Sequence, residues 1–163
     1  MRATKEFGVN GNETILDMTA EVTNLALSIC LSRQACVHFR TSDLPQGWSG
    51  GVCTPAPYLD LRGPHSSRLF VTAEPDELMQ EMRRSQEALL ETHFSSISLR
   101  GRHGIGGHGI NEGRYHKWAA VDSKRPGIHL VFQFQTLQSP EQSEKTFQVI
   151  IGRIVFMETS PKR

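Results

Sequence analysis

The densest group of chemically active side chains lies between Arg100 and Trp118, a stretch with six glycines and three histidines. Glycine allows a ligand to approach the backbone amides closely. Imidazoles titrate near neutral pH and guanidinium groups bind carboxylates and phosphates, so this composition predicts an anion site with acid–base partners. The side chains expected to handle protons are His103, His108, Glu112 and His116. Those expected to hold the anion are Arg100, Arg102 and Arg114.

Two other interpretations of this stretch stay open. Its histidines could bind a metal ion, but their spacing of five and eight residues matches no established ligand pattern, and we expect no metal and no cofactor. The stretch could also be a mobile hairpin or an assembly contact without chemistry. Residues 104 to 109 fit G-x-G-x-x-G, but a helix is not expected directly after them, and no Gly-Lys-Ser/Thr follows. A dinucleotide fingerprint and a Walker loop are therefore excluded.

Three further polar residues alternate with apolar ones on expected strands: His38, Arg40 and His129. Successive side chains of a strand point to opposite faces, so these three are expected on the face that the helices leave open. There they could contribute to anion binding. The alternative is a solvated sheet face, or one covered by another subunit.

Hydrophobic spacing predicts the elements that must position these groups. Apolar residues at helical intervals predict a helix from Thr14 to Ile29, and Pro75 begins a second helix that reaches Glu91. The strands expected in the first hundred residues are 4–9, 34–41, 69–72 and 93–99. This order is that of a ferredoxin-like βαββαβ arrangement, so we expect an α+β two-layer sandwich.

Three more antiparallel strands are expected to extend the sheet, at 114–121, 128–135 and 147–157. The last of these is apolar on both faces, which is typical of a central strand. No repeat or linker divides the sequence, so we expect one α+β domain over residues 1–163. Its irregular parts are expected to be a long connection at 42–68, a Gly/His-rich loop at 100–113 and a frayed tail at 158–163.

Composition narrows the class of protein. The 163 residues carry a formal net charge of +1, so no strong field should steer the protein to nucleic acid, although a local contact with RNA phosphate stays open. No segment approaches the ~18 apolar residues of a membrane helix, so no membrane is expected. Three cysteines cannot all pair within one chain, and reduced buried thiols favour a cytoplasmic protein.

Two functions of different classes fit these observations. In the first, the protein is a small domain that binds a phosphate- or carboxylate-bearing ligand at the Gly/His/Arg-rich stretch and hydrolyses it if the histidines converge. In the second, it is a non-catalytic assembly or regulatory subunit, such as a viral or phage structural protein, that uses its long loops as contact arms. In both, a homo-oligomer is expected. The sequence leaves open whether the protein is an enzyme.

Overall fold

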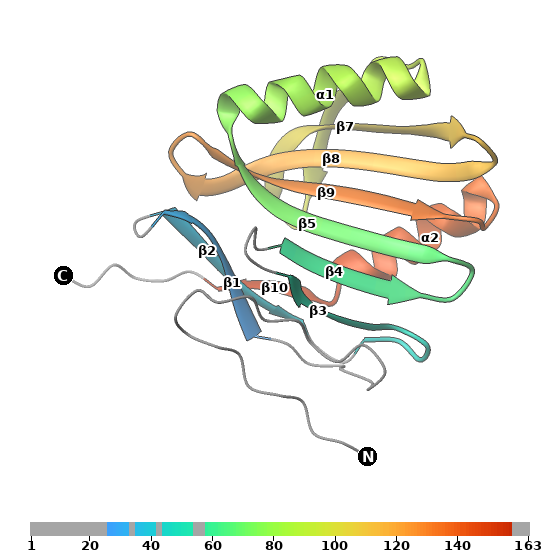
Figure 1. Cartoon of the computed structure of the whole chain (residues 1–163), viewed down its shortest axis with the longest axis horizontal. Helices are drawn as coiled ribbons and strands as arrows, with labels where there is room; N and C mark the ends of the chain where they lie inside the picture. The colour runs from blue at the N-terminus through green and yellow to red at the C-terminus, as the bar shows by residue number, and fades with distance from the viewer. Residues whose placement is uncertain (1–25, 33–34, 42–43, 54–57, 158–163) are drawn as a thin grey trace.

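The computed structural model describes residues 26–32, 35–41, 44–53 and 58–157, most of them in strands (Figure 1). A seven-stranded antiparallel sheet has the order β3-β4-β5-β9-β8-β7-β6, and a three-stranded sheet has the order β1-β2-β10. The larger sheet consists of β3 (Ser49–Cys53), β4 (Tyr58–Gly63), β5 (Ser67–Pro75), β6 (Ser95–Leu99), β7 (Arg102–Asn111), β8 (Arg114–Arg125) and β9 (Ile128–Thr136). The smaller sheet consists of β1 (Ala26–Ser32), β2 (Ala35–Thr41) and β10 (Ile154–Met157), and the helices are α1 (Asp76–Leu90) and α2 (Pro140–Ile151).

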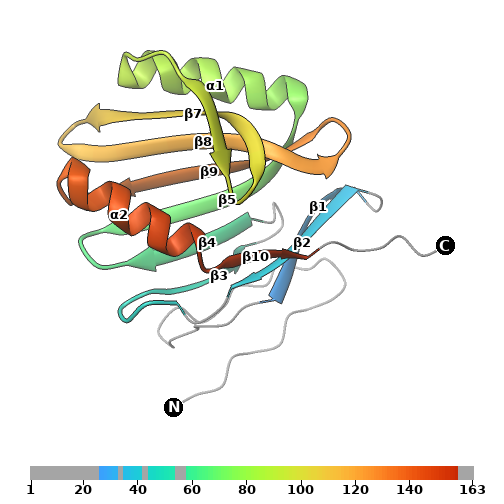
Figure 2. The same ribbon diagram turned by 180° about the vertical axis from the view of Figure 1, so that it is seen from behind.

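The two helices lie on opposite faces of the larger sheet. Figure 1 shows α1 running along β7 and β8, and Figure 2 shows α2 across the other face. Strand residues alternate between two apolar cores: Phe132 packs in one core with Phe147 of α2, and Val131 packs in the other with Met79 of α1. The predicted ferredoxin-like two-layer sandwich with a βαββαβ start is therefore wrong. An extended antiparallel sheet dominates instead, with a helix on each face.

The helix expected after Pro75 is confirmed. Pro75 is the N-cap of α1, and Asp76 and Glu77 lie in its first turn, where their carboxylates face the positive end of the helix dipole. Glu91 closes the helix in the left-handed conformation, with φ 53°. The expected strands at 34–41, 69–72, 93–99, 114–121 and 128–135 correspond to β2, β5, β6, β8 and β9.

The connection expected at 42–68 is not irregular throughout. It contains β3, β4 and the first residues of β5, which form an antiparallel meander. Gly63 leaves the space that the buried Trp48 ring fills, since a Cβ there would lie 2.2 Å from Trp48 Cε2. Gly50 and Gly63, which suggest a loop in the sequence, are thus packing residues of the short strands β3 and β4.

The segment 100–113 is not a loop either, because residues 102–111 form strand β7. Its two ends are two-residue turns, Arg100-Gly101 and Glu112-Gly113, and all four residues have positive φ of 51° to 77°. Positive φ at both central residues is what a type I′ hairpin turn requires. The predicted glycine cradle is therefore replaced by two tight hairpins on either side of a regular strand.

The glycines inside β7 allow neighbouring groups to approach its backbone. A Cβ at Gly107 would lie 2.3 Å from the Phe94 ring, and a Cβ at Gly109 would lie 3.0 Å from Leu90 Cβ at the end of α1. A Cβ at Gly104 would lie 1.9 Å from the carbonyl oxygen of Ala120 on β8. The glycine pattern is therefore explained by close packing of α1 and β8 against β7.

The strand expected at 147–157 is wrong over residues 147–151, which belong to α2. Phe147, Ile150 and Ile151 are buried at helical spacing on one side of that helix. The helix begins at Pro140, and the Ser139 side chain accepts a hydrogen bond from the Gln142 amide at 3.3 Å. A serine N-cap followed by proline was the start signal in the sequence.

Part of the first predicted helix is a strand instead. Its residues 26–29 lie in β1, whereas residues 14–25 lie outside the described part of the chain, as do the expected strand at 4–9 and the tail at 158–163. Neither described helix is long and apolar enough to cross a membrane.

We expect Gly107→Ala to destabilise the protein by roughly 1–3 kcal/mol, because its Cβ must displace the Phe94 ring. The free energy of unfolding in urea measures this cost. In a Phe94→Ala background, which removes the ring, the same substitution is expected to cost much less. An equal cost in both backgrounds would contradict the packing explanation.

Candidate functional site

Strand register brings a row of polar side chains together on the face of the sheet that carries α1. Arg62 on β4 is paired with Arg68 on β5, and Arg68 is paired with Gln135 on β9. Gln135 is paired in turn with His116 on β8, which is paired with Gly109 on β7. Directly paired residues share one face of a sheet. Four polar side chains from four strands therefore lie side by side.

A second row lies next to the first on the same face. Asp60 of β4 is paired with Phe70 of β5, and Phe70 is paired with Gln133 of β9. Gln133 is paired with Trp118, which is opposite Gly107. Trp118 is buried and its ring stacks on Phe94, with centroids 5.6 Å apart. This row thus passes from the α1 core to a charged side chain at β4.

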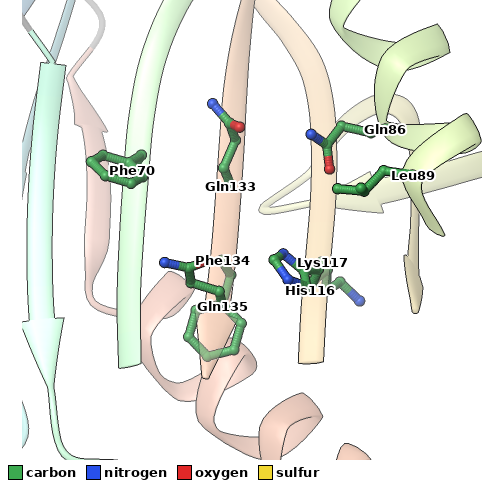
Figure 3. A pocket seen from close by; sticks show the side chains of 8 residues that line it. All are labelled: Phe70, Gln86, Leu89, His116, Lys117, Gln133, Phe134 and Gln135. Atoms are coloured by element: carbon green, nitrogen blue, oxygen red, sulfur yellow. The ribbon is translucent and has the colours of Figure 1, made fainter. Parts of the chain in front are cut away.

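A pocket of about 170 Å³ lies between α1 and these two rows (Figure 3). Its lining consists of Gln86 and Leu89 from α1, Phe70 from β5, His116 and Lys117 from β8, and Gln133, Phe134 and Gln135 from β9. Lys117 and Phe134 are paired with each other and alternate with the other lining residues of their strands, so they belong to the opposite face and border the pocket floor. The walls that remain are three amides, one imidazole and two apolar side chains. We call this pocket and the adjoining side chains of Arg62 and Arg68 the α1-side groove.

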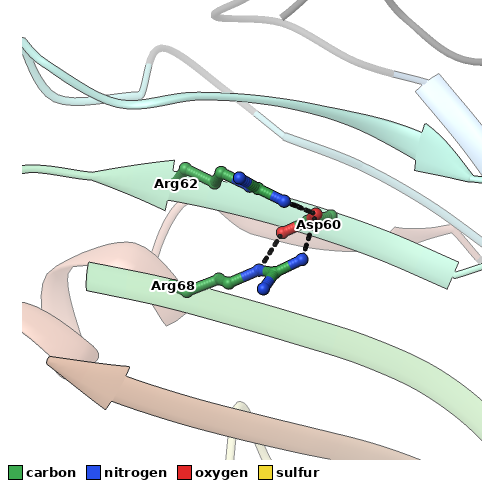
Figure 4. A network of polar contacts seen from close by, with 3 residues as sticks. All are labelled: Asp60, Arg62 and Arg68. Carbon is green, nitrogen blue, oxygen red and sulfur yellow. Dashed lines mark hydrogen bonds and ion pairs between the residues drawn. The ribbon is translucent and has the colours of Figure 1, made fainter. Parts of the chain in front are cut away.

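Beside the pocket, one buried carboxylate holds two arginines (Figure 4). Asp60 is 3% exposed, and its carboxylate accepts hydrogen bonds from Arg68 Nε at 3.1 Å and from Arg68 Nη2 at 3.0 Å. It also accepts from Arg62 Nε at 3.3 Å and Nη2 at 3.1 Å. The Arg68 guanidinium lies over the Phe70 ring, 4.1 Å from its centroid. Phe70 therefore joins the arginine pair to the pocket.

His116 is half-buried in this groove. Burial, followed by the positive charge of Arg114, holds the pKa of the imidazole below its usual value, and this outweighs the hydrogen bond to the Asn111 backbone and the charge of Glu112. The imidazole is accordingly neutral at pH 7, when it can either donate or accept a hydrogen bond. Arg114 and Glu112, both predicted from the sequence, act on His116 electrostatically.

The opposite face carries a separate charged cluster. Glu144 of α2 accepts hydrogen bonds from Tyr115 Oη and Lys117 Nζ, both at 2.6 Å. Burial acts to raise the pKa of Glu144, but these two hydrogen bonds hold it below its usual range. Burial, and then the bond to Glu144, raise the pKa of Tyr115. His108 stacks on Tyr115, with ring centroids 5.6 Å apart. This cluster fastens α2 to the sheet.

The structure therefore divides the predicted site residues. Only His116 lies in the pocket, whereas His108 is paired with Lys117 and belongs to the opposite face. His103 is exposed near the other end of β7, opposite Ser98. Arg102 is buried, and its Nη1 donates to the carbonyl of Asp122. The predicted proton-handling set does not converge on one point.

The remaining predicted ligand-binding residues are dispersed. Arg100 lies in the turn between β6 and β7. His129 is 3.0 Å from a carboxylate oxygen of Asp76 at the start of α1. His38 and Arg40 lie on β2 in the smaller sheet, and their side chains lie outside the described part of the structure. Within the described residues, no group of three His, Cys, Asp or Glu could hold a metal ion.

The polar residues of the groove that sequence reasoning missed are Asp60, Arg62, Arg68, Gln86, Gln133 and Gln135. For the two glutamines of β9 the signal was present, since they alternate with Leu130, Phe132 and Phe134 and so had to share one face of β9. Nothing local marks Asp60 or Arg68, which are brought to the glutamines only through the β4–β5 and β5–β9 pairings. Comparison of the chain with protein-family models, curated proteins and solved structures finds no match.

We expect the stability of the protein to fall as the pH decreases below about 6.5, the usual pKa of histidine. The folded imidazole of His116 binds a proton less readily than the unfolded one, so protonation favours the unfolded state in the window between the two pKa values. Unfolding in urea at pH 5.5, 6.5 and 7.5 measures the slope of the free energy of unfolding against pH. His116→Gln should flatten it, whereas His103→Gln, an exposed control, should leave it unchanged. An unchanged slope in His116→Gln contradicts the assignment.

The two arginines should differ in their effect on stability. Arg68→Gln is expected to cost roughly 1.5–3 kcal/mol, because it removes two charge-assisted hydrogen bonds from a buried carboxylate. Arg62→Gln should cost less than about 1 kcal/mol, because the Arg62 side chain is 53% exposed. Chemical denaturation of both variants measures the difference, and equal costs would show that Arg68 does not dominate.

Proposed function

We propose that this protein binds a small ligand with a carboxylate or phosphate group in the α1-side groove. The observation that carries the proposal is the Asp60-held arginine pair next to a pocket with amide, imidazole and apolar walls. Asp60 fixes the two guanidinium groups in place before a ligand arrives, which lowers the entropic cost of binding. Both stay accessible, with side-chain exposures of 53% and 31%.

The lining of the pocket favours binding over hydrolysis. A hydrolytic site needs a nucleophile and a base within hydrogen-bond reach of each other. The pocket has one imidazole, from His116, and three amides, from Gln86, Gln133 and Gln135. Amides donate and accept hydrogen bonds but do not exchange protons near neutral pH. Such a lining suits recognition.

A long polyanion such as RNA is a poorer match. The formal net charge of the chain is +1, and one of the two arginine charges in the groove is offset by Asp60. Nucleic-acid affinity comes mainly from many phosphate contacts, which require an extended basic surface. A single anionic group is what the arginine pair can neutralise.

We expect phenylacetate and phenyl phosphate to shift the NMR signals of His116, Gln133 and Gln135, and neutral phenylacetamide to bind at least about tenfold more weakly. Gln135→Glu introduces a negative charge between the arginines and His116, and should weaken both anions at least about tenfold. Gln148→Glu, an exposed change on α2, is the matched control and should leave binding unchanged.

Two results would overturn this proposal. In one, neither anion produces a saturable shift at the groove. In the other, Gln135→Glu and Gln148→Glu weaken the anions equally, which would place binding outside the groove.

A further inference from the structure

We propose that the ligand of the α1-side groove is the carboxy-terminal end of a peptide, about four residues long, with its carboxylate at Arg62 and Arg68. This inference rests on the proposed function and names its ligand class. The chain of the peptide would cross β5 and β9 toward α1. Charge, hydrogen-bonding groups and distance each support this class.

The charge of the groove matches a single negative charge. The two guanidinium groups of Arg62 and Arg68 share the carboxylate of Asp60, and these three side chains together carry a net charge of +1. Lys117 does not add to it, because its ammonium lies 2.6 Å from Glu144 on the opposite face. A peptide carboxylate carries one negative charge, whereas a phosphate monoester carries between one and a half and two at pH 7. The carboxylate is therefore the better neutralised of the two.

The walls between the arginines and α1 match a peptide chain. Gln133 and Gln135 project from alternate positions of β9 on the same face, and Gln86 faces them from α1. Each glutamine offers N–H donors and a carbonyl acceptor, which are the partners that peptide C=O and N–H groups require. Phe70 and Leu89 provide apolar surface for side chains of the peptide. An inorganic anion would leave these apolar walls without a partner.

The length of the groove sets the length of the ligand. From Arg62 on β4 to His116 on β8 the row crosses β5 and β9, which makes three interstrand steps. At about 4.8 Å for each step, the row is roughly 14 Å long. An extended peptide advances about 3.4 Å per residue, so about four residues span it. The carboxy-terminal side chain then lies against Phe70, and the first residue of the four lies near Leu89.

The test uses an acetylated tetrapeptide of three alanines and a carboxy-terminal leucine, with its carboxamide as the neutral counterpart. Calorimetry on the full chain should show that the acid binds at least about tenfold tighter than the amide, because the amide loses a charge-assisted contact. N-acetyl-leucine, which cannot span the row, should bind about tenfold more weakly than the tetrapeptide. Arg62→Gln should abolish the preference for the acid, and Lys145→Gln, which removes an exposed charge from α2, should preserve it.

The experiment distinguishes failure of the peptide proposal from failure of the anion-binding proposal. Equal binding of acid and amide, or of N-acetyl-leucine and the tetrapeptide, overturns the carboxy-terminal peptide as the ligand. Binding of phenyl phosphate at His116 and Gln135 without any binding of the tetrapeptide also overturns it, but leaves the anion-binding function intact. If neither phenyl phosphate nor the tetrapeptide binds, both proposals are wrong.

Discussion

The close approach of α1 to β7 is the constraint on which the arrangement of the groove depends. Where Gly107 and Gly109 lack side chains, Phe94 and Leu90 contact the strand backbone, and Trp118 stacks on Phe94 between sheet and helix. This contact holds α1 over β7 and β8 (Figure 1), so its exposed residue Leu89 borders a pocket rather than the centre of the sheet. Because α1 packs densely against β7, the polar residues along β9 and β5 stay accessible.

The alternation of strand residues then separates two kinds of chemistry. On the α1 face, Asp60 holds two arginines beside neutral amides, which leaves one positive charge near an uncharged pocket. On the other face, Lys117 and Tyr115 bind Glu144 and hold α2 in place. Because Lys117 is engaged there, the positive charge of the groove comes from the arginine pair. Strand register thereby places the arginine pair and the Glu144 cluster on opposite faces of the sheet.

Local patterns in the sequence were sufficient to predict the helix after Pro75 and strands such as 128–135. In these elements, spacing and capping act over a few residues. Local patterns did not predict β7. Its glycines allow close packing against Phe94 and Leu90, and no local pattern shows this contact. Local patterns were also insufficient for α2, where an apolar run outweighed the Ser139 cap. Of the candidate site, His116 was predicted, but its partners Gln135 and Arg68 reach it through pairings of strands far apart in the chain. Sheet order is set by such long-range contacts, and a single sequence does not display them.

In the proposed complex, the carboxylate of the ligand lies at the arginine pair while its body crosses β9 toward α1. Contacts between protein and ligand hydrogens in an NMR nuclear Overhauser spectrum of the acetylated tetrapeptide complex test this directly. The arrangement of the groove predicts contacts from the leucine methyl groups to the Phe70 ring, and from the acetyl group to the Leu89 methyl groups. Contacts of the bound peptide with Val149, an exposed residue of α2, in place of Phe70 and Leu89, would contradict it.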